Sequence, residues 1–171
     1  GYCRGLCSHC DDPNGEGYCP NFGQPDQNPG HANIALLVHP VESVAVRLAF
    51  TWYAGGSSDA QTAERLNAYR HQLADGEEVP LRTKGLVNRY PPGPFGAASV
   101  RAVLLRRFYT GELPYYGKDD QGRKRKRDNF VSSAPGRHQA LVSKELFEQA
   151  MQLRCLSKYC NRNGEGMPSL Y

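Results

Sequence analysis

The chain has 171 residues, of which 39% are hydrophobic and 22% are charged, and its 21 Lys and Arg side chains against 17 Asp and Glu give a formal charge of +4. This length suggests a single domain, and the apolar fraction is sufficient for a core, which argues against wholesale disorder. No run approaches the roughly 18 to 20 consecutive apolar residues that a bilayer-spanning helix requires, so we expect no transmembrane role.

Four cysteines near the start of the chain have the spacing C-x3-C-x2-C-x8-C. Short loops of this kind can bring four thiolates around a tetrahedral zinc ion, and C-x2-C is the usual spacing of a metal knuckle. Two disulfides would also cross-link this segment, which has almost no aliphatic residues, and free thiols are a third possibility. Because nothing else in the chain suggests secretion, we predict that residues 1–30 bind structural zinc through Cys3, Cys7, Cys10 and Cys19.

Two amphipathic helices are predicted next. The first begins at Pro40 and ends at Gly55-Gly56, and the second begins at Ser58, whose hydroxyl can cap the backbone while Gln61 reaches back, and continues to about Leu73. The apolar positions that define the first helix are Val41, Val44, Ala45, Leu48, Ala49, Trp52 and Tyr53.

A long loop and a third helix follow. The stretch 74–94 is rich in Gly, Pro and charged residues, which predicts a loop containing one hairpin. The helix after Gly96 has an inner face formed by Val100, Val103, Leu104 and Phe108. Its opposite side carries small residues beside arginines, which leaves room for a partner to approach closely: Ala98, Ser99, Ala102, Leu105 and Arg106, with Arg101 on the flank.

A β-hairpin with a basic tip is predicted over residues 111–131, where turn residues alternate with Tyr and Val. Residues 101–127 carry nine basic and three acidic side chains, a local excess that can neutralise phosphates and release counterions. The run 123–127 could also be a solvated hairpin tip, because blocks of like charge repel one another.

A last helix is predicted to begin at Ser143, with Val142 and Phe147 at the two positions of a hydrophobic staple. Cys155 and Cys160 lie five residues apart on this helix and therefore point in different directions, which favours packing or an exposed thiol for them.

Four stretches, read in order, resemble the recombinase domain of the large serine recombinases of the phage integrase and transposase type. Residues 63–67 (AERLN) resemble I-A-x-x-L-N, and residues 94–104 (PFGAASVRAVL) resemble W/F-S-x-x-T-V-x-x-x-L. Residues 108–117 (FYTGELPYYG) are similar to N-P-x-Y-x-G, and residues 135–154 (PGRHQALVSKELFEQAMQLR) to H-x-A-L-V-S-x-E-L-F. Tyr2, after Gly1, also suits the G-Y pair that opens this region in the family.

The sequence departs from the family pattern in four places. Gly96 stands where the family has a capping Ser, and Arg107-Phe108 stands for Asn-Pro. The loop 74–94 is longer than the common form, and the cluster from Cys3 to Cys19 is not part of the pattern.

The resemblance implies an α+β, mainly helical fold with a helix-turn-helix-like core and a small antiparallel β-hairpin. The cysteine spacing adds the expectation of an N-terminal cysteine-rich knuckle. We expect a DNA-binding domain over residues 31–160 and a linker over residues 161–171 leading toward a zinc ribbon. In the family, a serine of a separate N-terminal domain cuts DNA through a phosphoserine link, so we expect no catalytic residue in this chain. The parent protein is expected to be a cytoplasmic bacterial or phage protein that dimerises on DNA and forms a tetramer in synapsis.

Double-stranded DNA is the expected partner, with the third helix presenting its N-terminal half to the major groove. On this helix we predict contacts from Ser99, and guanine or phosphate contacts from Arg101 and Arg106. Arg107 is left out because, on the inner face, it could either extend its charged group to solvent along the apolar surface or pair with a carboxylate. Predicted phosphate contacts from the loop and the hairpin tip are Arg82, Lys84, Arg89, Arg123, Lys124, Arg125, Lys126 and Arg127.

Two other functions remain open from the sequence. One is a zinc-stabilised module that binds nucleic acid or protein without a recombinase role. The other is a metal-dependent nuclease that uses histidines and carboxylates.

Overall fold

The computed structural model describes residues 2–4, 36–73, 76–83, 93–117 and 130–163. The elements in chain order are β1 (Tyr2–Arg4), β2 (Leu36–Val38), α1 (Pro40–Ala54), α2 (Asp59–Ala68), β3 (Arg70–Gln72), β4 (Glu78–Pro80), α3 (Ala97–Leu104), the 3₁₀ turn η2 (Arg107–Thr110), β5 (Glu112–Tyr115), β6 (Ser132–Pro135) and α4 (Lys144–Asn163). Within these residues the predicted α+β, mainly helical class is confirmed. The predicted cysteine-rich knuckle lies outside the described residues, apart from the short strand β1.

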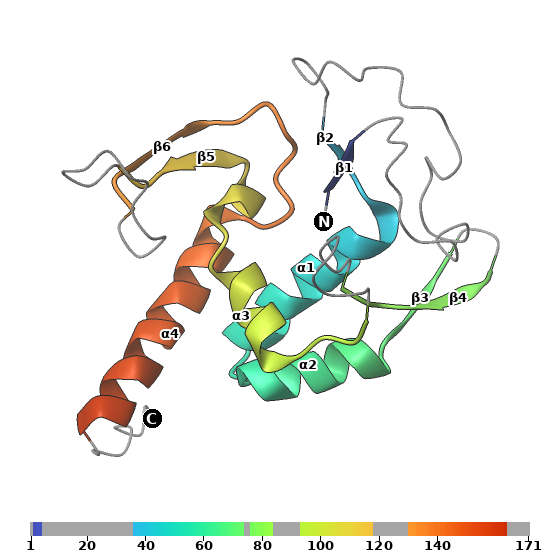
Figure 1. Cartoon of the computed structure of the whole chain (residues 1–171), viewed down its shortest axis with the longest axis horizontal. Coiled ribbons are helices and arrows are strands. Elements are labelled where there is room, and N and C mark those ends of the chain that lie inside the picture. Colours follow the sequence, from blue (N-terminus) through green and yellow to red (C-terminus); the bar gives the residue numbers. More distant parts are fainter. Residues whose placement is uncertain (1, 5–35, 74–75, 84–92, 118–129, 164–171) are drawn as a thin grey trace.

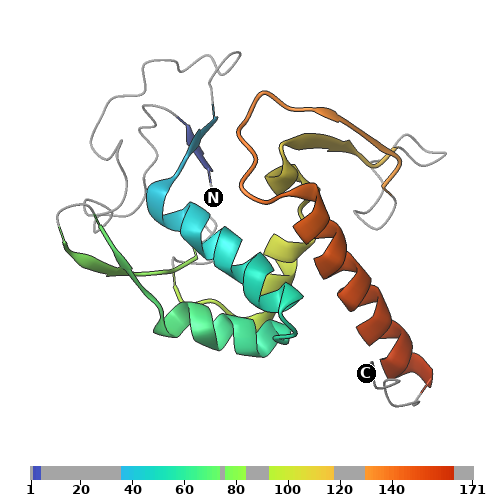
Figure 2. The same ribbon diagram turned by 180° about the vertical axis from the view of Figure 1, so that it is seen from behind.

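The helices form one body from which short antiparallel strand pairs extend (Figure 1). Strand β1 pairs with β2, β3 with β4, and β5 with β6. Helix α1 packs against α2, α3 and α4, and the β3–β4 and β5–β6 hairpins project from opposite sides of the body, as the reverse view also shows (Figure 2). No helix in the described ranges combines the length and the hydropathy needed to span a bilayer.

Helix α1 begins and ends where the sequence predicts, but it buries a wider face. The side chain of His39, for which the sequence suggested no role, caps the helix, because its Nδ1 accepts hydrogen bonds from the backbone N–H groups of Val41 and Glu42, each at 3.2 Å. Val46 and Phe50 are buried, although neither belongs to the predicted apolar stripe. Tertiary packing explains this wider buried face, because α1 contacts three other helices and a single apolar stripe cannot face all of them.

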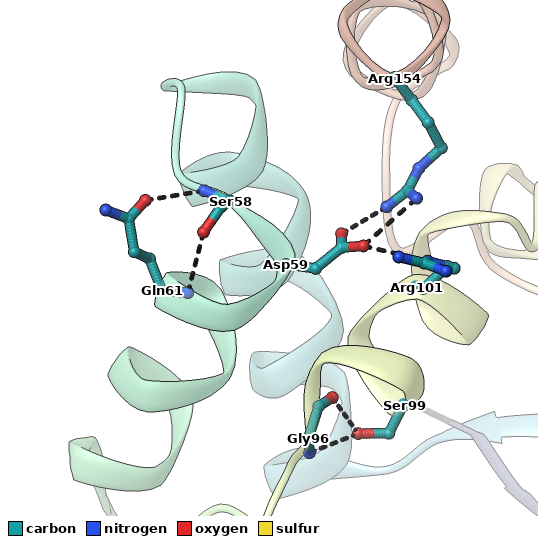
Figure 3. Close-up of polar contacts among 7 residues, drawn as sticks. All are labelled: Ser58, Asp59, Gln61, Gly96, Ser99, Arg101 and Arg154. Atoms are coloured by element: carbon teal, nitrogen blue, oxygen red, sulfur yellow. Dashed lines mark hydrogen bonds and ion pairs between the residues drawn. The ribbon is translucent and has the colours of Figure 1, made fainter. Parts of the chain in front are cut away.

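The predicted capping box at the start of α2 is confirmed. The Gln61 backbone N–H donates to Ser58 Oγ at 3.2 Å, and Gln61 Oε1 accepts from the Ser58 backbone N–H at 2.9 Å (Figure 3). These contacts satisfy two backbone donors that the first turn of a helix would otherwise leave unpaired.

The predicted end of α2 at about Leu73 is wrong. The helix ends at Ala68, and residues 70–72 form β3, which pairs with β4 through a turn in which Gly76 has a φ of +90°. The hairpin thus begins earlier than the predicted loop at 74–94. It places Val79 against the core, where 6% of its surface is exposed, so tertiary packing outweighs the helical pattern of residues 69–73.

The predicted β-hairpin is present, but its second strand, β6, begins at Ser132, just after the predicted span 111–131. The predicted start of the last helix is confirmed. Strand β5 pairs with β6 in the register Glu112↔Pro135 to Tyr115↔Ser132, while the predicted basic tip lies outside the described residues. At the start of α4, Ser143 Oγ accepts a hydrogen bond from the Leu146 backbone N–H at 3.2 Å.

Tyr2 attaches β1 to the C-terminal part of the chain. Its ring centroid lies 5.6 Å from Phe108, 6.1 Å from Tyr109 and 5.3 Å from His138, and its hydroxyl donates to the backbone carbonyl of Gln139. Burial, followed by the neighbouring Tyr109, raises the pKa of Tyr2 to about 12, so the phenol stays a neutral hydrogen-bond donor at physiological pH.

His138 has a positioning role at the start of the segment that leads into α4. Its ring stacks on Phe108 with centroids 3.9 Å apart, and its Nε2 lies 2.7 Å from the Phe108 carbonyl oxygen. Gly136 permits this packing, because a Cβ at that position would come within 2.5 Å of the His138 ring.

Candidate nucleic-acid interface

Asn67 joins the end of α2 to the start of α3. Its Nδ2 donates to the Phe95 carbonyl at 2.9 Å, and its Oδ1 accepts from the Phe95 N–H at 2.7 Å, although the two residues are 28 positions apart. The carboxamide therefore pairs with the Phe95 backbone in both directions, as a neighbouring strand would. The sequence placed Asn67 in a family-like motif but gave no indication of this contact.

We expect Asn67→Ala to lower the free energy of unfolding by about 1–3 kcal/mol, since two hydrogen bonds are lost and the Phe95 backbone groups lose their partner. Urea denaturation measures the change. The control is Gln149→Ala, an exposed amide on α4, which should change stability by less than about 0.5 kcal/mol. Equal small effects of both variants would contradict the role assigned to Asn67.

Helix α3 begins at Gly96, and Ser99 completes its first turn. Ser99 Oγ accepts from the Gly96 backbone N–H at 2.9 Å and donates to the Gly96 carbonyl at 2.7 Å (Figure 3). The hydroxyl hydrogen is thus engaged within the chain, and a phosphate contact by Ser99 would compete with this bond.

Arg101 lies on the flank of α3, next to the buried Val100 in the sequence, with 61% of its side chain exposed. Its Nε donates to Asp59 Oδ2 at 3.2 Å (Figure 3). Asp59 is the first residue of α2, where a carboxylate also complements the helix dipole. The arginine that the sequence assigned to DNA is therefore held by an acidic residue that the sequence did not single out.

Asp59 has a second arginine partner, from α4. Nη2 of Arg154 lies 2.5 Å from Asp59 Oδ1, and Nη1 lies 3.4 Å from Oδ2 (Figure 3). Only 8% of the Arg154 side chain and 14% of the Asp59 side chain are exposed. The Arg154 Cζ also lies 4.9 Å from the centroid of the Tyr53 ring. We call Asp59, Arg101 and Arg154 the arginine–aspartate triad.

The structure describes only some of the other residues that the sequence predicted to contact DNA. Arg106 is exposed just after α3, and Arg82 is half-buried after β4. The prediction that Arg106 lies on the same helix as Arg101 is wrong, because α3 ends at Leu104. Outside the described residues lie Lys84, Arg89, Arg123, Lys124, Arg125, Lys126 and Arg127.

Arg107 pairs with carboxylates, as its inner-face position predicted. Nη1 lies 3.4 Å from Glu112 Oε2, and Nη2 lies 3.1 Å from Glu148 Oε1. Glu112 also contacts Lys144 Nζ at 2.7 Å, and Lys144, with a smaller contribution from Arg107, lowers the pKa of Glu112 against the opposing effect of burial. These ion pairs tie β5 to α4, which gives Arg107 a structural role.

Metal-binding groups can be assessed only in the part of the chain that the structure describes. There, no three His, Cys, Asp or Glu side chains come together in a way that could hold an ion. Cys155 is an exposed free thiol. Of the four predicted zinc ligands, Cys3 has its backbone in β1, and Cys7, Cys10 and Cys19 lie outside the described residues.

Comparison with known families identifies the class of this chain. A family model described as Recombinase matches residues 40–155, about two-thirds of the chain, so the chain belongs to the Recombinase family. This membership connects the chain with DNA recombination and implies DNA as its partner. No match is found among curated proteins or solved structures.

Proposed function

We propose that this chain recognises DNA for a site-specific serine recombinase. It would hold the attachment site while a separate N-terminal domain cuts and rejoins the strands through a phosphoserine intermediate. The observation that carries the proposal is the exposed Arg101 on the flank of α3, whose inner face is anchored by the buried Val100 and Leu104. Membership of the Recombinase family supports it independently.

Helices α2 and α3 would act as a helix-turn-helix-like pair. In such a pair the second helix enters the major groove. The usual turn has about three or four residues, whereas here a longer connection that includes the β3–β4 hairpin joins the helices, and the Asn67–Phe95 contact supplies the local attachment. The exposed Ala98, near the start of α3, leaves space for the backbone to approach a groove.

Base recognition and phosphate contact would be divided between two sets of residues. The planar guanidinium of Arg101 can bind guanine O6 and N7, and Arg106 can bind either a base or a phosphate. A contact from Ser99 would require its hydroxyl to give up the hydrogen bond to the Gly96 carbonyl. The phosphate contacts would come from Arg82, Lys84, Arg89 and the basic run 123–127, which adds affinity that does not depend on sequence.

The test compares a preferred duplex, selected by the full chain from a randomised library, with a random duplex of equal length. We expect Arg101→Ala to weaken binding to the selected duplex by about 10-fold or more while changing random-duplex binding little. Replacing the run 123–127 with alanines should weaken binding to both duplexes equally and flatten the dependence on salt. Arg47→Ala, at an exposed position on α1, is the control and should leave the selectivity unchanged.

Equal losses on both duplexes for the Arg101→Ala and basic-run variants would contradict the assignment. Failure of the chain to bind any duplex at low salt would favour a protein-interaction module. Cleavage of the duplex on addition of Mg²⁺ or Mn²⁺ would favour the nuclease alternative.

We also infer a structural zinc site at Cys3, Cys7, Cys10 and Cys19, supported by their spacing alone. Elemental analysis of the reduced protein should find one zinc ion per chain, and its absence would remove the four-thiolate site.

A further inference from the structure

We propose that Asp59 is a positioning residue for DNA recognition, which aligns the Arg101 guanidinium while Arg154 neutralises the carboxylate from the buried side. This inference rests on the proposed DNA-binding function, because Arg101 must contact DNA for its alignment to matter. It assigns to an acidic residue a role in DNA specificity, although a carboxylate near the DNA phosphates would by charge alone weaken binding.

The geometry leaves the recognition edge of Arg101 open. A guanidinium carries five N–H donors, and Asp59 takes only the Nε–H. Among the described residues, Asp59 is the one hydrogen-bond partner of Arg101, so the donors on Nη1 and Nη2 remain available. Those two groups form the fork that pairs with guanine O6 and N7 or with two phosphate oxygens. Asp59 can therefore fix the direction of the side chain without occupying that fork.

Arg154 explains how Asp59 can orient Arg101 without cancelling its charge. Both oxygens of Asp59 accept hydrogen bonds from Arg154, whose side chain is 8% exposed. The arginine–aspartate triad has two cations and one anion, which leaves one net positive charge. The exposed member of the triad is Arg101, at 61%, so the side that faces solvent remains cationic.

Alignment before binding should improve selectivity. A free arginine side chain has many rotamers, and immobilising it on a base costs binding free energy. Because the contact with Asp59 already restricts the rotamers of Arg101, part of this immobilisation has taken place before DNA binds. The loss of the contact is expected to reduce selectivity for the selected duplex by about 3- to 10-fold, which is the usual cost of immobilising one such side chain.

The experiment uses Asp59→Asn in the full chain, with the selected and random duplexes described above. Removing a carboxylate makes the protein more positive, so charge alone predicts tighter binding to both duplexes. The positioning role predicts a 3- to 10-fold fall in the ratio of selected to random affinity. The matched control is Glu64→Gln, an exposed carboxylate on the same helix, which should raise general affinity without lowering the ratio.

A double variant separates positioning from a general structural effect. In the Arg101→Ala background, Asp59→Asn should cause no further loss of selectivity, because the group that Asp59 aligns is already absent. The second variant, Asp59→Glu, keeps the charge but lengthens the side chain by one methylene, and it should also lower the ratio. If Asp59→Asn fails to fold, Asp59→Glu tests the alignment of Arg101 at constant charge, so a fall in the ratio of selected to random affinity still supports positioning and an unchanged ratio contradicts it.

Two results would overturn the inference. One is an unchanged ratio of selected to random affinity for Asp59→Asn. The other is an equal fall in this ratio when Asp59→Asn is introduced into the original chain and into the Arg101→Ala variant. If Arg101→Ala lowers selectivity and Asp59→Asn does not, only this inference fails. If Arg101→Ala itself has no effect on selectivity, the proposed function fails as well.

Discussion

Phe50→Ala is expected to lower the free energy of unfolding by about 3–5 kcal/mol, the range for removing a large aromatic side chain from a core. Phe50 is 0% exposed and lies in the C-terminal half of α1. Its ring centroid is 5.9 Å from that of Phe147, so the pair connects α1 with α4. Truncation would remove buried apolar surface and leave a cavity between helices that are far apart in the sequence.

Urea denaturation of the full chain measures this effect. Phe50→Leu should cost clearly less, because leucine fills much of the space that alanine leaves empty. Leu156→Ala, at a position on α4 that is 57% exposed, should change stability by about 0.5 kcal/mol or less. A loss below about 1.5 kcal/mol for Phe50→Ala would mean that the α1–α4 contact is not part of the core.

The starts of the helices could be predicted from the sequence because their signals are local. The Ser58–Gln61 capping box and the cap at Ser143 involve residues three positions apart. Phe50 was missed for the opposite reason. Its burial depends on Phe147, and a periodic pattern within one helix cannot indicate how many neighbours will cover that helix.

The end of α2 shows a second limit of local patterns. Residues 69–73 continue a helical arrangement of apolar side chains, yet Arg70–Gln72 pair as a strand with Glu78–Pro80. The pairing is decided by the turn at Gly76 and by burial of Val79, which lie beyond the helical window. Helix propensity differs by fractions of a kcal/mol per residue, so packing of this kind can reverse it.

The candidate site was likewise predictable only in part. The exposure of Arg101 and the carboxylate pairing of Arg107 agree with the faces that the sequence assigned to them, although Arg107 lies in η2 and not on α3. The partnership of Asp59 with Arg101, 42 positions away, and with Arg154, 95 positions away, depends on how three helices pack. No spacing rule within a single sequence connects residues at such separations.

We expect substitutions of the two arginines in the arginine–aspartate triad to lower the free energy of unfolding by unequal amounts. Arg154→Leu is expected to lower the free energy of unfolding by about 3 kcal/mol, because breaking a buried ion pair leaves a charge without adequate compensation. Asp59, 14% exposed, would keep only its single contact with Arg101. Arg101→Ala should cost no more than about 1 kcal/mol, because the pair it breaks has one exposed member.

The double variant Asp59→Asn, Arg154→Leu tests whether the loss comes from the stranded carboxylate. It should recover at least half of the stability lost in Arg154→Leu, since the uncompensated charge is gone. Arg154 Nε is buried without a hydrogen-bond partner among the described residues, so the native ion pair is itself imperfectly satisfied and its joint removal is tolerable. Urea denaturation of the four proteins gives the coupling energy directly. Similar losses for Arg154→Leu and Arg101→Ala would contradict the division of roles, in which Arg154 holds α4 to α2 and Arg101 remains free to reach a ligand.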